Sequence, residues 1–201
     1  MLRVYRYRVK NHTKLLNSQA AAVNRVWNYC NETQRAAVSR GRKWLSGFDL
    51  NNLTAGCSKA LGLHSGTVNA VCERYAHSRR QHRKPWLRWR SDKSLGWIPL
   101  KGRDLRVDGE GFRFQGIHFR VWHSRTIPVG AKIKDGTTFS QDSRGRWYLN
   151  VCIELPDAQA RHNDEAVGID LGLKDLAVLS NGERIANPRV YRKWEIRLGA
   201  A

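Results

Sequence analysis

A single carboxylate, Asp170, interrupts an apolar run near the end of this 201-residue sequence, between Ile169 and Leu171. A charge inside such a run is costly to bury unless it is paired or holds a metal ion. Gly168 and Gly172 flank it, so a ligand or another stretch of backbone can approach closely. Two interpretations follow. Asp170 either caps the turn after its strand, or it is a metal ligand.

A second stretch with chemistry in its side chains runs from residue 74 to residue 90, where cations and tryptophans are interleaved. Lys and Arg neutralise phosphates and aromatic rings stack on bases, so this combination is typical of proteins that hold nucleic acid without reading its sequence. A helix end that is simply solvated is the alternative. The residues expected to contact nucleic acid here are Arg74, Arg79, Arg80, Arg83, Lys84, Trp86, Arg88, Trp89 and Arg90.

The charge balance of the whole chain favours a polyanionic partner. Lys and Arg number 36 against 17 Asp and Glu, a formal net charge of +19. Residues 1–100 alone hold 19 basic and 4 acidic residues, so the first half carries most of this charge. A ribosomal-type protein or a membrane-surface protein would also be basic, and charge alone therefore identifies no partner.

The four cysteines, Cys30, Cys57, Cys72 and Cys152, are widely spaced and form no Cys-x-x-Cys pair. We therefore expect no zinc site in this chain, and instead reduced thiols that face the core of a cytoplasmic protein. The sequence contains no apolar run near 18 residues and no signal peptide, so no membrane association is expected.

Residues 1–10 alternate apolar and basic side chains, which predicts a strand with one wet, basic face. Leu2 and Val4 are the apolar members, with Tyr5 and Tyr7 as further candidates. The basic members are Arg3, Arg6 and Arg8. An edge strand whose charges prevent aggregation shows the same pattern.

Three helices are expected between residues 11 and 94. Apolar residues recur every three or four positions over residues 14–40, which predicts a long amphipathic helix. A shorter helix is expected over residues 50–61, capped near Asp49, and a third over residues 67–82, with Ser65 as its N-cap.

From residue 95 onward the apolar period changes to two, and glycine-containing turns recur. This spacing suits a small barrel. A polar, linker-like segment separates these strands from three more, of which the last two are joined by an Asn-Gly hairpin turn, and a helix begins near residue 191. The expected strands are 96–100, 105–107, 111–114, 117–122, 130–140, 146–155, 166–171, 176–180 and 183–186.

Residues 168–188, GIDLGLKDLAVLSNGERIANP, resemble the first catalytic motif of the RuvC-type, RNase H-like nuclease domain. The form is close to that of the TnpB (OrfB) proteins of insertion sequences and of the related compact type V CRISPR effectors. Residues 142–148 resemble that family's D-x-x-G-x-W-Y hairpin, residues 84–94 its basic P-x-F-K-S-K stretch, and residues 22–32 the helix that begins its recognition lobe. The family's aspartate is the first of three acidic ligands for Mg²⁺, which implies a catalytic, metal-binding role for Asp170 alone.

The resemblance implies an α+β fold in which a wedge-type β-barrel carries an inserted basic helical recognition lobe and is followed by the first strands of an RNase H-like (RuvC) domain. The wedge strand grips guide RNA in the family, which adds Arg3, Arg6 and Arg8 to the expected nucleic-acid contacts. The expected domains are 1–10 with 95–156 for the wedge barrel, 11–94 for the helical lobe, 157–165 for a linker and 166–201 for an incomplete nuclease domain.

The function implied is the nucleic-acid-binding part of a transposon-associated, RNA-guided DNA endonuclease that hydrolyses phosphodiesters with Mg²⁺ when complete. Its partners would be a guide RNA and a double-stranded DNA target, in the prokaryotic cytoplasm and at the nucleoid when bound to DNA. The family's glutamate, second aspartate and Cys-x-x-Cys ribbon have no counterpart in this sequence, so we expect binding without cleavage by this chain alone. The alternatives are a non-catalytic RNA- or DNA-binding relative and a translation-type RNA binder, although such a binder has no use for GIDLG after a linker.

Overall fold

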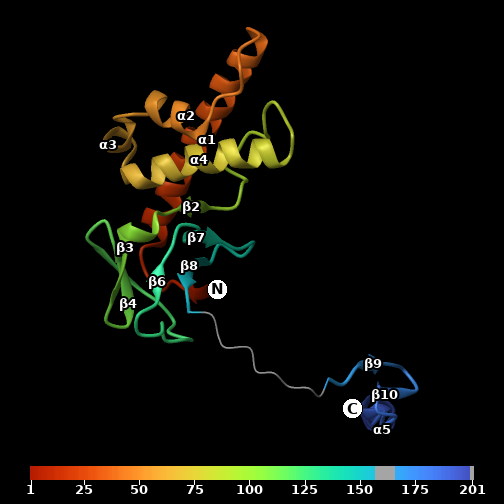
Figure 1. Cartoon of the computed structure of the whole chain (residues 1–201). Coiled ribbons are helices and arrows are strands. Elements are labelled where there is room, and N and C mark those ends of the chain that lie inside the picture. Colours follow the sequence, from red (N-terminus) through yellow and green to blue (C-terminus); the bar gives the residue numbers. More distant parts are fainter. Residues whose placement is uncertain (157–165, 200–201) are drawn as a thin grey trace. The chain divides into compact units, whose positions relative to one another are not determined.

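The computed structural model describes residues 1–156 and 166–199 as helices and antiparallel strands (Figure 1). This mixture confirms the α+β class. The chain divides into two compact units, Met1–Asp157 and Ala158–Ala201, which are treated separately below. The expected linker, 157–165, lies outside the described residues. No helix among the described residues is long and apolar enough to cross a membrane.

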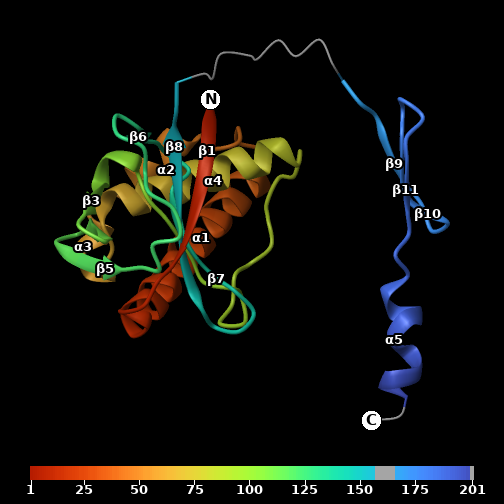
Figure 2. The same ribbon diagram turned by 90° about the horizontal axis from the view of Figure 1, so that it is seen from below.

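The larger sheet of the first unit is organised around its longest strand, β8 (Trp147–Glu154), in which alternate residues from Trp147 to Val151 are buried. Its strand order is β1-β8-β7-β2, and β6 also pairs with β8. Figure 2 shows β1 and β8 side by side. The other members are β1 (Leu2–Arg8), β2 (Trp97–Pro99), β6 (Lys132–Ile133) and β7 (Thr138–Gln141).

The single strand expected over residues 130–140 is wrong, because a turn separates β6 from β7. Gly136 has a φ of +103°, which a residue with a side chain rarely adopts. The Thr137 hydroxyl donates to the Lys134 carbonyl and accepts from the Cys152 N–H, so the turn is bonded to β8.

The face of β1 that lies toward the core agrees with the expectation at Tyr7 and differs from it at Leu2 and Val4. Tyr7 and Val9 are buried, whereas Leu2 and Val4 are 62% and 59% exposed, on the same side as Arg6. The reason is tertiary: the Tyr7 ring packs 5.2 Å from that of Phe112, and its hydroxyl donates to a loop carbonyl.

A second, three-stranded sheet follows a short 3-10 helix (Gly102–Asp104) and buries three phenylalanine side chains, Phe112, Phe114 and Phe119. A β-bridge between Val9 and Val121 joins the end of β1 to the chain just after this sheet. The strands thus form two sheets, and closure into a wedge-type barrel stays a prediction. The members of the second sheet are β3 (Leu105–Asp108), β4 (Gly111–Phe114) and β5 (Ile117–Arg120).

The helices lie against one another and share a continuous core with the sheets. Figure 1 shows α4 crossing α1, where the sulfur atoms of Cys30 and Cys72 lie 3.6 Å apart in buried positions. The expected long helix and third helix are present within one or two residues at each end. The helices are α1 (Thr13–Ser39), α2 (Gly47–Leu53), α3 (Cys57–Leu61) and α4 (Ser65–Gln81).

Two expected helix starts are wrong. Ser46 begins α2 through a capping box with Asp49, and Gly56, with a φ of +82°, separates α2 from α3, so residues 50–61 are not one helix. The N-cap of α4 is His64, whose ring nitrogen accepts from the Gly66 N–H at 3.2 Å, and Ser65 is the first helical residue.

The second unit contains the three expected strands in the order β11-β10-β9, followed by a helix. Gly182, with a φ of +88°, makes the expected hairpin turn between β10 and β11. Assignment of this sheet to a RuvC-like domain stays a prediction. The elements are β9 (Ile169–Leu171), β10 (Asp175–Leu179), β11 (Arg184–Ala186) and α5 (Val190–Leu198).

Candidate nucleic-acid interface and candidate metal ligand

Three asparagines of α1 bind the backbone of the segment that follows α4. Asn24, Asn28 and Asn31 are spaced four and three residues apart, which places them on one face of the helix. An amide side chain offers a donor and an acceptor together, and so can satisfy the N–H and the C=O of one residue. We call these three residues the asparagine clamp.

Asn24 donates to the Ser91 carbonyl at 3.4 Å, and the other two members of the clamp each make a pair of bonds. The Asn31 side chain donates to the Leu87 carbonyl at 2.9 Å and accepts from the Leu87 N–H at 2.8 Å. Asn28 makes the same pair of bonds with the backbone of Arg90, both at 2.8 Å. Tyr75 of α4 donates to the Asn31 oxygen at 2.8 Å, which fixes that amide within the buried core.

The side chain of Arg90 is used inside the protein as well. Its Nε donates to Asn24 at 2.6 Å and its Nη2 to the Leu95 carbonyl at 2.8 Å. Burial lowers the pKa of the Arg90 guanidinium. Arg90 therefore supports the loop from within, in addition to any contact with a ligand.

The clamp presents two tryptophans to solvent. Trp86 is 43% and Trp89 49% exposed. Each directly precedes a residue whose backbone the clamp binds, Leu87 and Arg90 respectively. They line a hollow of about 780 Å³ between the end of α4 and the loop, which we call the tryptophan hollow. No Asp or Glu is among the described residues that line it. The lining residues are Trp27, Ser78, His82, Lys84, Trp86, Leu87, Arg88, Trp89, Arg90 and Ser94.

The clamp was not recognised from the sequence, although a signal for it exists. Asparagine is a poor helix former because its amide competes for backbone hydrogen bonds. Asn24, Asn28 and Asn31 at helical spacing inside a long helix therefore indicate an external partner for their amides.

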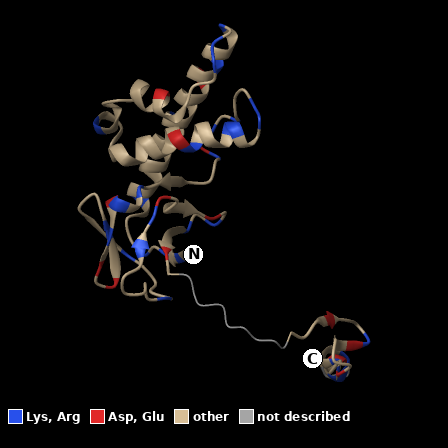
Figure 3. Ribbon diagram, in the orientation of Figure 1, with Lys and Arg blue, Asp and Glu red and all other residues tan. Residues whose placement is uncertain are grey.

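Most of the expected nucleic-acid contacts are exposed. Figure 3 shows the cations gathered at the end of α4 and along the loop after it. Five of these cations, in α4 and in the loop after it, form no ion pair with a carboxylate within the part of the chain that the structure describes. Arg3, Arg6 and Arg8 are exposed on β1, where the Arg6 guanidinium lies 3.9 Å from the centre of the Tyr148 ring. The five exposed cations are Arg74, Arg80, Arg83, Lys84 and Arg88.

Arg79 and the half-buried Arg90 are the exceptions, and the expected exposure of Arg79 is wrong. Arg79 is 1% exposed, donates to the Leu45 carbonyl and places its guanidinium 4.9 Å from the Trp44 ring centre. Burial lowers its pKa. Position 79 continues the inward stripe of Cys72 and Tyr75 at helical spacing, so the apolar periodicity already placed it inside.

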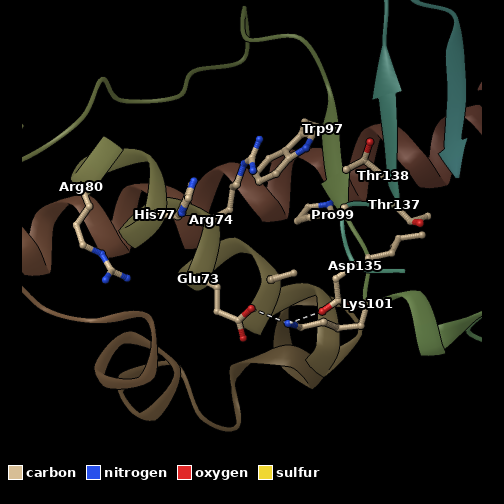
Figure 4. Close-up of a pocket in the computed structure, with 13 residues that line it drawn as sticks. Glu73, Arg74, His77, Arg80, Trp97, Pro99, Lys101, Asp135, Thr137 and Thr138 are labelled. Carbon is tan, nitrogen blue, oxygen red and sulfur yellow. Dashed lines mark hydrogen bonds and ion pairs between the residues drawn. The ribbon is translucent and has the colours of Figure 1, made fainter. Parts of the chain in front are cut away.

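A second hollow, of about 440 Å³, lies beside the same helix and has mixed charge (Figure 4). Lys101 bonds Glu73 at 2.6 Å and Asp135 at 3.3 Å across it. Burial alone would lower the pKa of Lys101, but its bonds with these two carboxylates outweigh that effect and raise it. Arg74 and Trp97 form another part of the wall. With two carboxylates in its lining, this hollow suits a polyanion less well than the tryptophan hollow does.

The candidate metal ligand, Asp170, is exposed in β9 and pairs with Val178 of β10. Its carboxylate accepts no hydrogen bond among the described residues, so the turn-capping interpretation gains no support. No group of three His, Cys, Asp or Glu among the described residues is arranged to hold a metal ion. Asp175, one of the two other carboxylates of the motif, lies 3.5 Å from Arg184. A strand carboxylate suits Mg²⁺ as one ligand, and the described residues supply no others beside it.

The two glycines that flank Asp170 have different surroundings. At Gly168 the close neighbour is Ser180, whose hydroxyl accepts from the Gly168 N–H at 2.9 Å. A Cβ at Gly172 would lie 3.2 Å from the Asp175 carbonyl oxygen, so the turn after β9 leaves little room for a side chain.

Comparison with known proteins gives one partial match. No family model matches the sequence. A stretch of 78 residues, 39% of this chain, is 40% identical to a protein of Streptomyces pristinaespiralis named "Putative RNA-guided DNA endonuclease". The match covers 19% of that protein, so this chain spans only about a fifth of its curated relative. This similarity confirms the resemblance to RNA-guided DNA endonucleases, and the finer assignment to TnpB-type proteins stays a prediction.

Proposed function

We propose that this chain is the nucleic-acid-binding part of a TnpB-like RNA-guided DNA endonuclease. Guide RNA and a double-stranded DNA target would be its partners, and the RNA would read the target sequence by base pairing. The observation that carries the proposal is the set of five exposed cations in α4 and the loop after it, which lack carboxylate partners in the described structure. They are Arg74, Arg80, Arg83, Lys84 and Arg88. The name of the Streptomyces relative supports the same class of activity.

Asp170 is the residue we assign to the metal. Mg²⁺ bound at a nuclease site activates water and stabilises the leaving oxygen. Asp170 contributes one hard oxygen ligand on a paired strand, with the Gly172 turn immediately after it. One carboxylate cannot by itself hold the Mg²⁺ of a nuclease site. The remaining ligands therefore have to come from other parts of a complete active site.

A non-catalytic RNA- or DNA-binding protein of the same descent is the second candidate. That no group of three possible metal ligands gathers among the described residues favours it. In that case the cationic surface would bind nucleic acid and Asp170 would have no catalytic role.

The test measures binding and cleavage side by side. The purified chain is incubated with structured RNA and with duplex DNA, in Mg²⁺ and in EDTA, over a salt series. We expect salt-dependent RNA binding and no Mg²⁺-dependent cutting by the chain alone. Weak binding to both nucleic acids would contradict the proposal.

The role of Asp170 is tested in a longer form of the protein that supplies the remaining acidic residues. We expect Asp170→Ala to abolish Mg²⁺-dependent cutting and to leave RNA affinity unchanged. Asp175→Asn, which alters the neighbouring carboxylate of the same hairpin, is the matched control and should still cut. Cutting by the Asp170→Ala protein would contradict the metal-binding role of Asp170. Loss of folding together with loss of cutting would indicate that Asp170 is a structural carboxylate instead.

A further inference from the structure

We propose that the tryptophan hollow binds unpaired nucleobases of a single-stranded nucleic acid, and that the asparagine clamp is the positioning device that presents its two exposed tryptophans. The inference rests on the proposed function in that it takes nucleic acid as the partner. It adds which surface binds, which form of nucleic acid is bound and which residues position the surface.

The chemistry of the lining points to this ligand. Trp86 and Trp89 have about half of their surface free, and a flat indole face stacks on any base. Lys84 and Arg88 lie in the same lining and suit the phosphates that connect successive bases. Since no carboxylate is among the described lining residues, nothing there repels a polyanion. The volume of about 780 Å³ lies within the range of roughly 300–1,000 Å³ typical of ligand pockets.

An unpaired strand fits this surface better than a duplex does. In a duplex each base is already stacked on its neighbours, and phosphates are the groups that face outward. Stacking on Trp86 or Trp89 therefore requires a base that is free of the helix. Trp27 also lines the tryptophan hollow, and its indole N–H donates to the Arg88 carbonyl at 3.1 Å.

The clamp explains how two indoles stay exposed. Asn28 and Asn31 each donate one hydrogen bond to the loop backbone and accept one from it. These four bonds fix the backbone at residues 87 and 90, next to both tryptophans. Ordering the loop before the ligand arrives reduces the entropy lost on binding. A loop without these bonds would be free to fold its indoles onto nearby apolar surface.

Another exposed tryptophan in the same unit gives a matched control. Trp122 is 59% exposed, but it lies outside the tryptophan hollow and Lys10 covers its ring at 4.3 Å. Substituting it removes the same side chain without changing the hollow or the clamp.

The experiment measures affinity by fluorescence anisotropy, using the full chain and labelled oligonucleotides. The probes are single-stranded RNA, single-stranded DNA, a duplex of equal length and a strand of abasic sugar-phosphate units. For the Trp86→Ala/Trp89→Ala protein we expect affinity for both single strands to fall by about tenfold or more. Affinity for the duplex and for the abasic strand should stay within about twofold of the wild type, as should every affinity of Trp122→Ala.

The clamp has its own variant. Asn28→Ala removes both bonds to Arg90, and we expect it to weaken binding to single strands but not to the abasic strand. In the Trp86→Ala/Trp89→Ala background it should cause no further loss, because the clamp acts through the tryptophans. Equal loss for abasic and base-containing strands would mean a general structural defect and would overturn the positioning role.

Further outcomes separate the two proposals. If the wild type binds no nucleic acid, both fail. If the wild type binds and the double tryptophan variant has the same affinity for single strands as Trp122→Ala, this inference is overturned and the proposed function stands.

Trp86→Leu/Trp89→Leu, which keeps apolar volume without an aromatic face, replaces the alanine variant if that protein does not fold. The same loss of affinity for single strands is expected. Comparing the RNA and DNA arms identifies which strand is preferred.

Discussion

Arg79 and Arg80 are neighbours in the sequence and have opposite surroundings. Arg79 lies in the core beneath Leu45 and Trp44, whereas Arg80 is exposed at the end of α4. A cation releases counterions from nucleic acid only where it can reach a phosphate. The two residues therefore differ in function despite having the same charge.

This difference predicts unequal salt dependence of RNA binding. For Arg80→Met we expect the slope of log affinity against log salt concentration to become shallower by about 0.7, the value for one lost contact with a single strand. For Arg79→Met we expect the wild-type slope, because its guanidinium is buried inside the protein and cannot reach a phosphate. Equal slopes for the two variants, measured by anisotropy titration, would contradict the assignment.

Short polar interactions decide where several elements begin. The capping box of Ser46 and Asp49 starts α2 three residues before the expected start, since the Ser46 hydroxyl accepts from the Asp49 N–H and the Asp49 carboxylate accepts from the Ser46 N–H. The Ser46 hydroxyl also donates to the Asp49 carboxylate, and this bond, together with the bond from the Ser46 N–H, lowers the pKa of Asp49. At α4 the same function falls to His64, and Ser65 makes no capping bond.

Replacing the two serines tests these caps. We expect Ser46→Ala to lower the free energy of unfolding by about 1 kcal/mol, the usual cost of losing an N-cap side chain. Ser65→Ala, at the position that the sequence suggested as a cap, should change it by no more than a few tenths of that cost. Chemical denaturation of both variants measures the difference, and a larger loss at Ser65 would restore the sequence-based expectation.

At the scale of the whole molecule, the two units differ in how much apolar surface they bury. The first has one continuous core shared by its helices and sheets. In the described part of the second, Ala177 is the buried apolar residue, and large apolar side chains such as Leu171, Leu173 and Tyr191 are exposed. Few buried contacts mean a low free energy of local opening.

Amide hydrogen exchange is expected to show this difference. Amides of β10 should exchange faster than amides of β8, because most side chains of β8 are buried in the core and most of those of β10 are not. Mass spectrometry of peptides from the full chain measures both strands in one sample. Equal protection of the two strands would show that the second unit is stabilised by contacts beyond those described.

The features that the sequence alone determined are local ones. Apolar period and turn residues placed the long helix α1, the strands of the second unit and the hairpin at Gly182, because each depends on neighbours within a few residues. The excess of cations before residue 100 and the GIDLG motif are likewise properties of the chain itself.

The tertiary structure decided which of these residues are available to a ligand. Arg79 is buried by contact with Leu45, 34 residues away, and the clamp joins Asn31 to Leu87 across 56 residues. The inward face of β1 depends on Phe112, a still more distant partner. Such contacts arise when separate elements pack together, so a local pattern cannot specify them, and they determine that Trp86 and Trp89 face solvent while Arg79 does not.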